Sequence, residues 1–96
     1  MRTLDINAKE WFDKTYGNSY FSARVLIDYS LPTEQTILIP FQYGYGDHYI
    51  DMCMQELKKL GLTNYDWIRL LIDSGVVVRC NKQTGCLKKE VINYAK

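Results

Sequence analysis

Alternating hydrophobic and polar residues predict a β-hairpin in the first half of the chain. Across residues 19–29, side chains of odd and even number fall on opposite faces of a strand, with Phe21 on the hydrophobic face. Residues 30–33 have the composition of a turn, and residues 35–41 form a second β-branched segment in which Pro40 marks a strand end or a sheet edge. We therefore expect the two segments to pair as antiparallel strands.

The N-terminal segment predicts a short strand followed by a short helix. Residues 3–6 alternate as in a strand, and residues 8–15 contain residues typical of a helix. Asn7 is a suitable N-cap for that helix, and Glu10 stands at the third helical position, as in a capping box. Residues 16–18, which include a glycine, end it.

Helical periodicity predicts two helices in the second half of the chain. The first covers residues 47–60 and ends at Gly61. Its hydrophobic face consists of Ile50, Cys53, Met54, Leu57 and Leu60. The second begins at a cap formed by Thr63 and Asp66 and extends to Asp73. Its expected core-facing residues are Trp67, Ile68, Leu71 and Ile72.

The remaining residues predict a buried strand and a C-terminal tail. Residues 76–80 form the hydrophobic strand. After Gly85, Leu87 and Val91 fit a short helix, while residues 91–94 also fit an edge strand, and of these two alternatives we favour the helix. The predicted fold is a single α+β domain, residues 1–96, in which the helices pack on one face of a small, mainly antiparallel sheet.

Composition and charge restrict the classes of partner. The 96 residues are 47% hydrophobic and 24% charged, as in an ordinary globular domain, and the net charge is +1. An acidic mimic of DNA is therefore excluded, and any attraction to nucleic acid or to a membrane must be local. The three cysteines and the lack of a secretory signal or a long apolar stretch predict reduced thiols and a cytoplasmic protein that does not bind membranes.

The most unusual segment is the glycine-spaced aromatic turn at residues 41–49. Glycines permit close approach to a ligand and a helix N-terminus favours anions, but the spacing matches neither of the common phosphate-binding motifs. His48, the only histidine, does not align with Cys53 on a helix, and Cys80 and Cys86 lack a usual zinc spacing. We therefore expect no metal, no cofactor and no enzymatic activity.

The eight tyrosines favour a binding surface instead. Tyrosine offers a large, stiff contact area with a polar tip, and binding interfaces are enriched in it. Several tyrosines fall near the two glycine-containing turns. The residues that we expect to bind a partner are Tyr20, Arg24, Tyr43, Tyr45, His48 and Tyr49.

Three segments within the first 60 residues carry a resemblance: residues 8–14 (AKEWFDK), 17–25 (GNSYFSARV) and 39–46 (IPFQYGYG). They resemble small uncharacterised proteins encoded by bacteriophages and related mobile elements. The resemblance contains no motif of known chemistry. It implies an accessory phage protein, a class that frequently inhibits host machines, including nuclease-based immunity such as CRISPR effectors.

Three functional hypotheses follow from the sequence. The first is a non-enzymatic inhibitor or modulator that binds a host protein, with a defence nuclease complex as one such partner, in the host cytoplasm. The second is a module for single-stranded nucleic acid, in which the tyrosines stack on bases while Arg24 and the C-terminal lysines contact the backbone. The third is a small enzyme or a protein that binds a phosphate ligand at the turn around Gly44.

Overall fold

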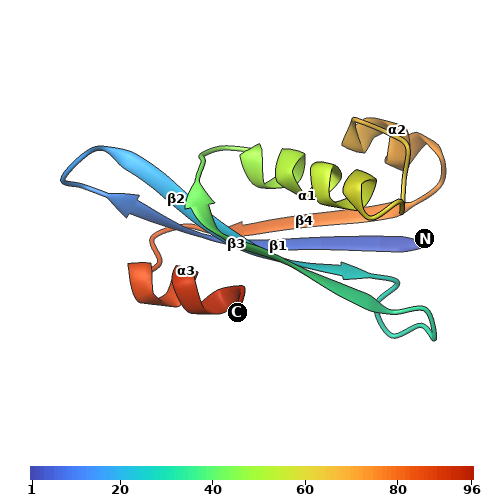
Figure 1. Ribbon diagram of the computed structural model, residues 1–96, viewed down its shortest axis with the longest axis horizontal. Coiled ribbons are helices and arrows are strands. Elements are labelled where there is room, and N and C mark those ends of the chain that lie inside the picture. Colours follow the sequence, from blue (N-terminus) through green and yellow to red (C-terminus); the bar gives the residue numbers. More distant parts are fainter.

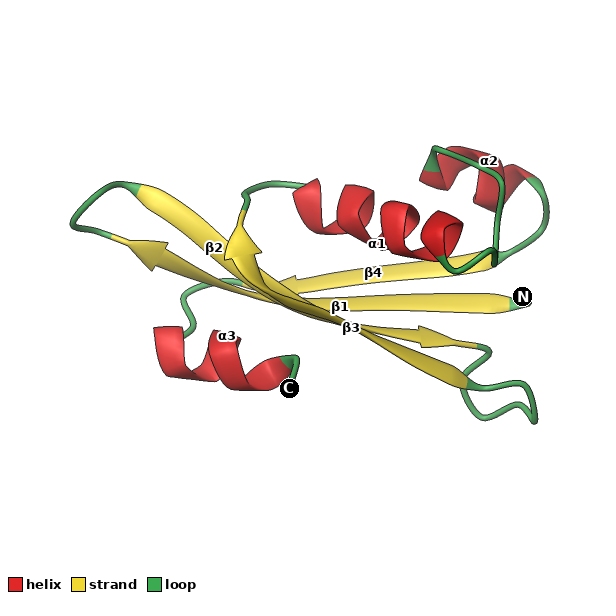
Figure 2. Cartoon of the chain, in the orientation of Figure 1, coloured by secondary structure: helices red, strands yellow, loops and turns green.

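The computed structural model describes all residues of the chain, 1–96, as a four-stranded sheet with three helices. The elements in chain order are β1 (Thr3–Asp13), β2 (Asn18–Ile27), β3 (Gln35–Tyr43), α1 (His48–Lys59), α2 (Ile68–Asp73), β4 (Val77–Gln83) and α3 (Lys88–Tyr94). The strand order is β3-β2-β1-β4, in which β1 pairs antiparallel with β2 and parallel with β4. The predicted α+β class and its mainly antiparallel sheet are confirmed (Figures 1 and 2).

Alternation places two different sets of side chains on the two faces of the predicted hairpin. Strands β2 and β3 pair antiparallel, with Ala23 opposite Ile39 and Val25 opposite Ile37. Ala23, Val25 and Ile39 are buried, so the odd-numbered residues of β2 face the main core. A register shift lies between Phe21 and Ala23, and both residues remain in the core. The predicted antiparallel hairpin is thus confirmed.

The first strand extends much further than the sequence predicts. In place of a helix over residues 8–15, β1 continues to Asp13 and pairs with β2 from Leu4 opposite Ile27 to Asp13 opposite Asn18. The local helix propensity is overridden because β1 pairs with β2 as far as Asp13, and β4 pairs with its other side as far as Lys9. Residues 14–17 form the hairpin turn, where Gly17 adopts a φ of +71°.

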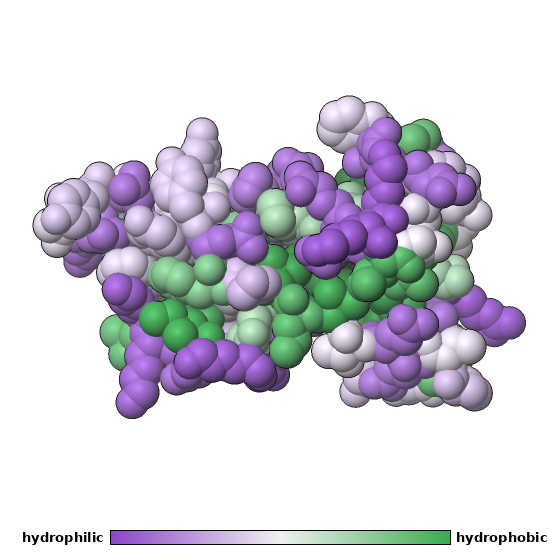
Figure 3. All heavy atoms as spheres, viewed as in Figure 1, coloured by the Kyte–Doolittle hydropathy of each residue, from purple (hydrophilic) through white to green (hydrophobic).

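Helix α1 supplies the other layer of the main core. Its buried residues are Tyr49, Cys53, Met54 and Leu57, which recur at the spacing of one helical face. They pack against the odd face of β2 and against Leu4 and Ile6 of β1. Leu60, which the periodicity places on that face, is exposed at the helix end. In the space-filling view, hydrophobic residues form a band below α1, over the strands (Figure 3).

Helix α2 and strand β4 bury less than predicted. Helix α2 has only six residues, and it buries Leu71 while Ile68 is half-buried. Trp67 precedes the helix in an extended conformation and is 67% exposed, and Ile72 is exposed as well, so neither belongs to the core. The strand predicted over residues 76–80 is confirmed as part of β4, but its predicted burial is wrong, because β4 is an edge strand with mostly exposed residues.

Helix α3 lies on the opposite face of the sheet from α1 and α2 (Figure 1). The expectation of a C-terminal helix is confirmed, whereas the expectation that all helices share one face holds only for α1 and α2. Val91 is fully buried, and its carbonyl accepts a hydrogen bond from the hydroxyl of Ser22 on the even face of β2. The even face of β2 is therefore covered by α3 at Ser22, whereas its odd face is covered by α1. None of the helices has the length and apolar character that crossing a membrane requires.

Asp28 fastens the start of β1 to the end of β2. Its Oδ1 accepts hydrogen bonds from the backbone N–H groups of Arg2 (2.5 Å) and Thr3 (3.1 Å), and its Oδ2 accepts one from the hydroxyl of Thr33 (2.8 Å). The residue has a φ of +54°, a conformation that aspartate tolerates better than most residues. The hydrogen bond from Arg2, followed by that from Thr33, lowers the pKa of Asp28 to about 2.

We predict that Asp28→Asn lowers the melting temperature at neutral pH and that this difference disappears in acid. The pKa of Asp28 in the folded protein lies below the ordinary value of 3.8, so its stabilisation is complete above that value and is lost as the pH falls through about 2. Thermal unfolding of both proteins over this pH range tests the prediction. A difference in melting temperature that does not change with pH would contradict it.

Candidate functional site

A loop of four residues, 44–47, joins β3 to α1 and is held by main-chain hydrogen bonds. The N–H of Gly44 donates to the carbonyl of Ser19 on β2 (3.0 Å). The N–H of His48, the first residue of α1, donates to the carbonyl of Tyr45 (3.2 Å). The backbone of the loop is therefore hydrogen-bonded both where the strand ends and where the helix begins.

Gly44 occupies a position where a side chain does not fit. The imidazole of His48 packs edge-on against the ring of Phe21, with centroids 5.8 Å apart and planes at 83°. A Cβ atom on Gly44 would lie 2.5 Å from Cδ2 of His48 and 2.7 Å from Cε1 of Phe21. The buried backbone of Gly44 thus passes directly against both rings and fixes the position of the imidazole.

Lys82 of β4 holds the loop from below. Its Nζ donates to the carbonyl of Gly46 (2.9 Å) and forms an ion pair with Oε2 of Glu10 on β1 (2.9 Å). The side chains of Lys82 and Glu10 are only 20% and 15% exposed, so solvent screens this pair weakly. The ammonium also lies 5.8 Å from the ring centroid of Tyr49. Two strands and the first turn of α1 therefore meet beneath the loop.

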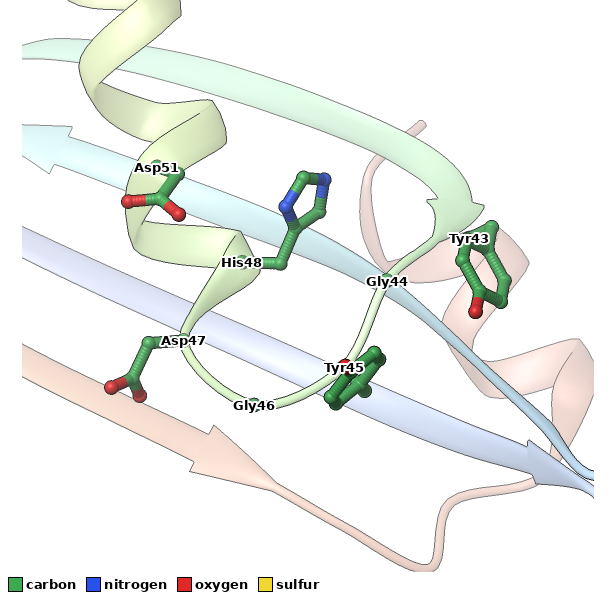
Figure 4. A pocket seen from close by; sticks show the side chains of 7 residues that line it. All are labelled: Tyr43, Gly44, Tyr45, Gly46, Asp47, His48 and Asp51. Atoms are coloured by element: carbon green, nitrogen blue, oxygen red, sulfur yellow. The ribbon is translucent and has the colours of Figure 1, made fainter.

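The outer side of the loop borders an open cleft of about 400 Å³. Its lining residues are Tyr43, Gly44, Tyr45, Gly46, Asp47, His48 and Asp51. Figure 4 shows Tyr43 at the end of β3, Tyr45 on the loop, and His48 and Asp51 on the first turn of α1, while the carboxylate of Asp47 points away from the tyrosine rings. Tyr43 is 55% exposed and Tyr45 is 71% exposed, so both rings are accessible to a partner.

The charged groups of the cleft are acidic. The carboxylates of Asp47 and Asp51 form no ion pair, and Asp47 does not cap α1 with its side chain. The nearby ammonium of Lys82 is already bound to Gly46 and Glu10. The charge of Asp47 extends toward β4, where burial first and this carboxylate second raise the pKa of Cys80. An anion is therefore disfavoured in the cleft and a cation is favoured.

The six residues predicted from the sequence do not form one surface. Tyr43, Tyr45 and His48 meet at the cleft. Tyr49 is only 6% exposed, because its ring lies beneath the loop in the core, and it cannot contact a partner at the surface. The sequence contains a hint of this, since Tyr49 precedes the buried Cys53 by four residues on α1.

Tyr20 and Arg24 lie on the other face of the sheet, with α3. Tyr20 is half-buried in a cluster with Trp11 and Phe41, whose ring centroids lie 5.6 and 5.3 Å from its own. Its ring also meets that of Tyr43 edge-on at 5.9 Å, so aromatic contacts continue around β3 to the cleft. Arg24 donates from Nε to the carbonyl of Tyr94 and lies over the Tyr94 ring, so it helps to fasten α3.

The contacts that β1 makes in this region are not predicted from the sequence. Trp11 and Glu10 reach the aromatic cluster and the loop only because β1 continues past residue 8 as a strand. Strict alternation from Leu4 through Ala8, both buried, is the pattern that could have predicted the longer strand.

The thiols and the histidine form no reactive arrangement. Burial raises the pKa of Cys53 to about 12, so this thiol is protonated at neutral pH and is a poor nucleophile. Burial also raises the pKa of Cys80. No group of three or more histidine, cysteine, aspartate and glutamate residues is placed to hold a metal ion.

Comparison of the chain with protein-family models, curated proteins and solved structures finds no match.

We predict that Gly44→Ala destabilises the protein by about 1–3 kcal/mol, because the added methyl group overpacks the contact between His48 and Phe21. Chemical denaturation measures this loss. The double variant Gly44→Ala/His48→Ala should lose less than the sum of the two single variants, because the alanine at 48 makes room for the methyl group. Strict additivity would show that the loop does not depend on this contact.

We predict that Lys82→Met lowers the free energy of unfolding by about 1–3 kcal/mol, because it leaves the nearly buried carboxylate of Glu10 and the carbonyl of Gly46 without their partner. In Lys82→Met/Glu10→Gln no unpaired charge remains, so part of this stability should return. Chemical denaturation of the three proteins tests the idea. Equal losses in the single and the double variant would argue against it.

Proposed function

We propose that this protein is a non-enzymatic inhibitor or modulator that binds a host protein through the cleft between β3 and α1. The observation that carries the proposal is the exposure of Tyr43 and Tyr45 on an anchored loop. Exposed aromatic residues on an anchored backbone lose no backbone freedom on binding, and aromatic residues dominate many protein interfaces.

The surroundings of the loop support binding by a preformed surface. Gly44 packs tightly against His48 and Phe21, and Lys82 of β4 donates a hydrogen bond to the carbonyl of Gly46 in the loop. Inhibition by occlusion requires only a stable surface of adequate area and no chemical step. The resemblance to phage and mobile-element proteins adds a context, in which the protein acts in the host cytoplasm and a nuclease complex of host defence is one class of partner.

A second candidate function is the binding of single-stranded nucleic acid on the opposite face. The observation that favours it is the cluster of Trp11, Tyr20 and Phe41, beside which Lys88 lies 5.3 Å from the Trp11 ring centroid. Aromatic rings beside cations are typical of surfaces that stack bases. Against this, Trp11, Tyr20 and Phe41 are half-buried and contact one another, and Arg24 is engaged with Tyr94.

The third hypothesis, a phosphate ligand at the turn, receives less support. Asp47 and Asp51 line the cleft, and their carboxylates repel a phosphate. We therefore place protein binding first and nucleic-acid binding second.

We predict that the tagged wild-type protein retains a host protein from lysate and that Tyr43→Ala/Tyr45→Ala retains at least tenfold less of it, because hot-spot aromatics commonly contribute 2 kcal/mol or more, roughly a factor of 30. Quantitative mass spectrometry of the captured proteins measures the difference. Circular dichroism and thermal unfolding verify that the variant is folded.

The matched control is Tyr29→Ala/Tyr65→Ala, which removes two exposed tyrosines outside the cleft and should capture the partner normally. Equal capture by wild type and Tyr43→Ala/Tyr45→Ala would refute the proposed site. If only Trp67→Ala failed to capture the host protein, the binding site would lie at this exposed tryptophan beside α2 and not at the cleft. Retention of an oligonucleotide that weakens steeply with salt would favour the second candidate instead.

A further inference from the structure

The cleft combines two features that select a particular side chain of a partner. The first is a pair of exposed aromatic rings, those of Tyr43 and Tyr45, on the side of β3. The second is a pair of carboxylates, those of Asp47 and Asp51, on the side of α1, with no ion-pair partner of their own. Aromatic faces attract cations, and carboxylates pair with them, so both features favour a positively charged group.

No cation of the chain itself occupies this place. Lys82, the nearest basic residue that contacts the loop, approaches from the inner side and is bound to Gly46 and Glu10. The cleft is therefore open to a cation from outside, while its floor is fixed by the chain.

Elsewhere the same chain forms both of the contacts that the cleft offers. The guanidinium of Arg24 lies 4.4 Å from the ring centroid of Tyr94, and Arg79 donates from Nε and Nη2 to the two carboxylate oxygens of Asp5, at 2.6 and 3.0 Å. A planar guanidinium serves both purposes at once, because it stacks on a ring and still presents its N–H groups at its edge. An ammonium lacks the planar face.

We propose that the cleft binds an arginine side chain from a basic segment of the partner protein. This inference rests on the proposed function and specifies the chemistry of the partner. The guanidinium lies against the tyrosine rings and donates hydrogen bonds to Asp51. The carboxylate of Asp47, which is directed toward β4, adds negative charge at longer range. A single arginine binds weakly by itself, so its contribution within a larger interface is specificity and rate of association.

The first test uses a defined probe, an acetylated and amidated glycine–arginine–glycine peptide, titrated into the ¹⁵N-labelled protein. We expect chemical-shift changes centred on residues 43–51. The matched peptide with citrulline, which has the same shape without the charge, should bind at least about fivefold more weakly, since a charge-assisted contact is worth about twice a neutral one. Shifts that are absent, scattered over the molecule, or equal for the two peptides would overturn the proposal.

The second test uses Asp47→Asn/Asp51→Asn, with Asp66→Asn/Asp73→Asn as the control. Both variants change the net charge equally, but Asp66 and Asp73 pair with Lys58 and Arg69 away from the cleft. The cleft variant should weaken binding of the arginine peptide about tenfold, which corresponds to 1.4 kcal/mol, and the control should not. Equal weakening in both variants would indicate a general charge effect and would overturn the proposal.

A third comparison separates this inference from the proposed function. If the host protein captured by wild type is lost by Tyr43→Ala/Tyr45→Ala but retained in full by Asp47→Asn/Asp51→Asn, the binding function stands and the arginine-binding inference fails. If the tyrosine variant retains the host protein but the labelled wild type still binds the arginine peptide in the cleft, the proposed site of the host protein fails and the arginine site stands.

Discussion

The pairing of β1 with β2 along ten residue pairs is the constraint on which both the fold and the candidate site depend. One end of this ladder is fixed by Asp28, which binds the backbone of Arg2 and Thr3. The other end carries Glu10 to the underside of the loop and Trp11 to the aromatic cluster. Because β1 also pairs with β4, the same strand brings Lys82 within reach of that loop. A shorter β1 would leave the cleft without its floor.

The contacts around the loop explain how so small a domain can hold an exposed loop in one conformation. Irregular backbone is usually mobile, because its polar groups are bonded to water. Here the carbonyl of Gly46 accepts a hydrogen bond from the ammonium of Lys82, and the N–H of Gly44 donates one to the carbonyl of Ser19. The absence of a side chain at Gly44 allows the loop to pack against the core. These contacts order the backbone that carries Tyr45 and follows Tyr43, so this part of the chain loses little conformational entropy in any interaction.

Most elements could be predicted from the sequence because their hydrophobic period is regular. The alternation of β2 and the helical spacing of Cys53 and Leu57 on α1 predict their faces correctly. The prediction for residues 8–13 is wrong because their identities favour a helix locally, whereas pairing with β2, and with β4 as far as Lys9, determines the outcome. The site was predictable in part. Tyr43 and Tyr45 follow from the glycine-spaced turn, but the contacts made by Lys82 depend on the parallel crossover, which short-range patterns do not reveal.

The net charge of +1 conceals an uneven distribution of charge. On the face that carries α3, Lys9, Arg24 and Lys88 lie over aromatic rings, whereas the cleft beside α1 presents Asp47 and Asp51. Charges on opposite faces of a thin sheet cancel at long range, but each dominates within a Debye length of about 8 Å. The local charge that a group at the surface meets therefore depends on the face. On the binding function proposed above, the carboxylates beside the exposed tyrosines favour a basic protein segment over a phosphate, because they attract a cation and repel an anion.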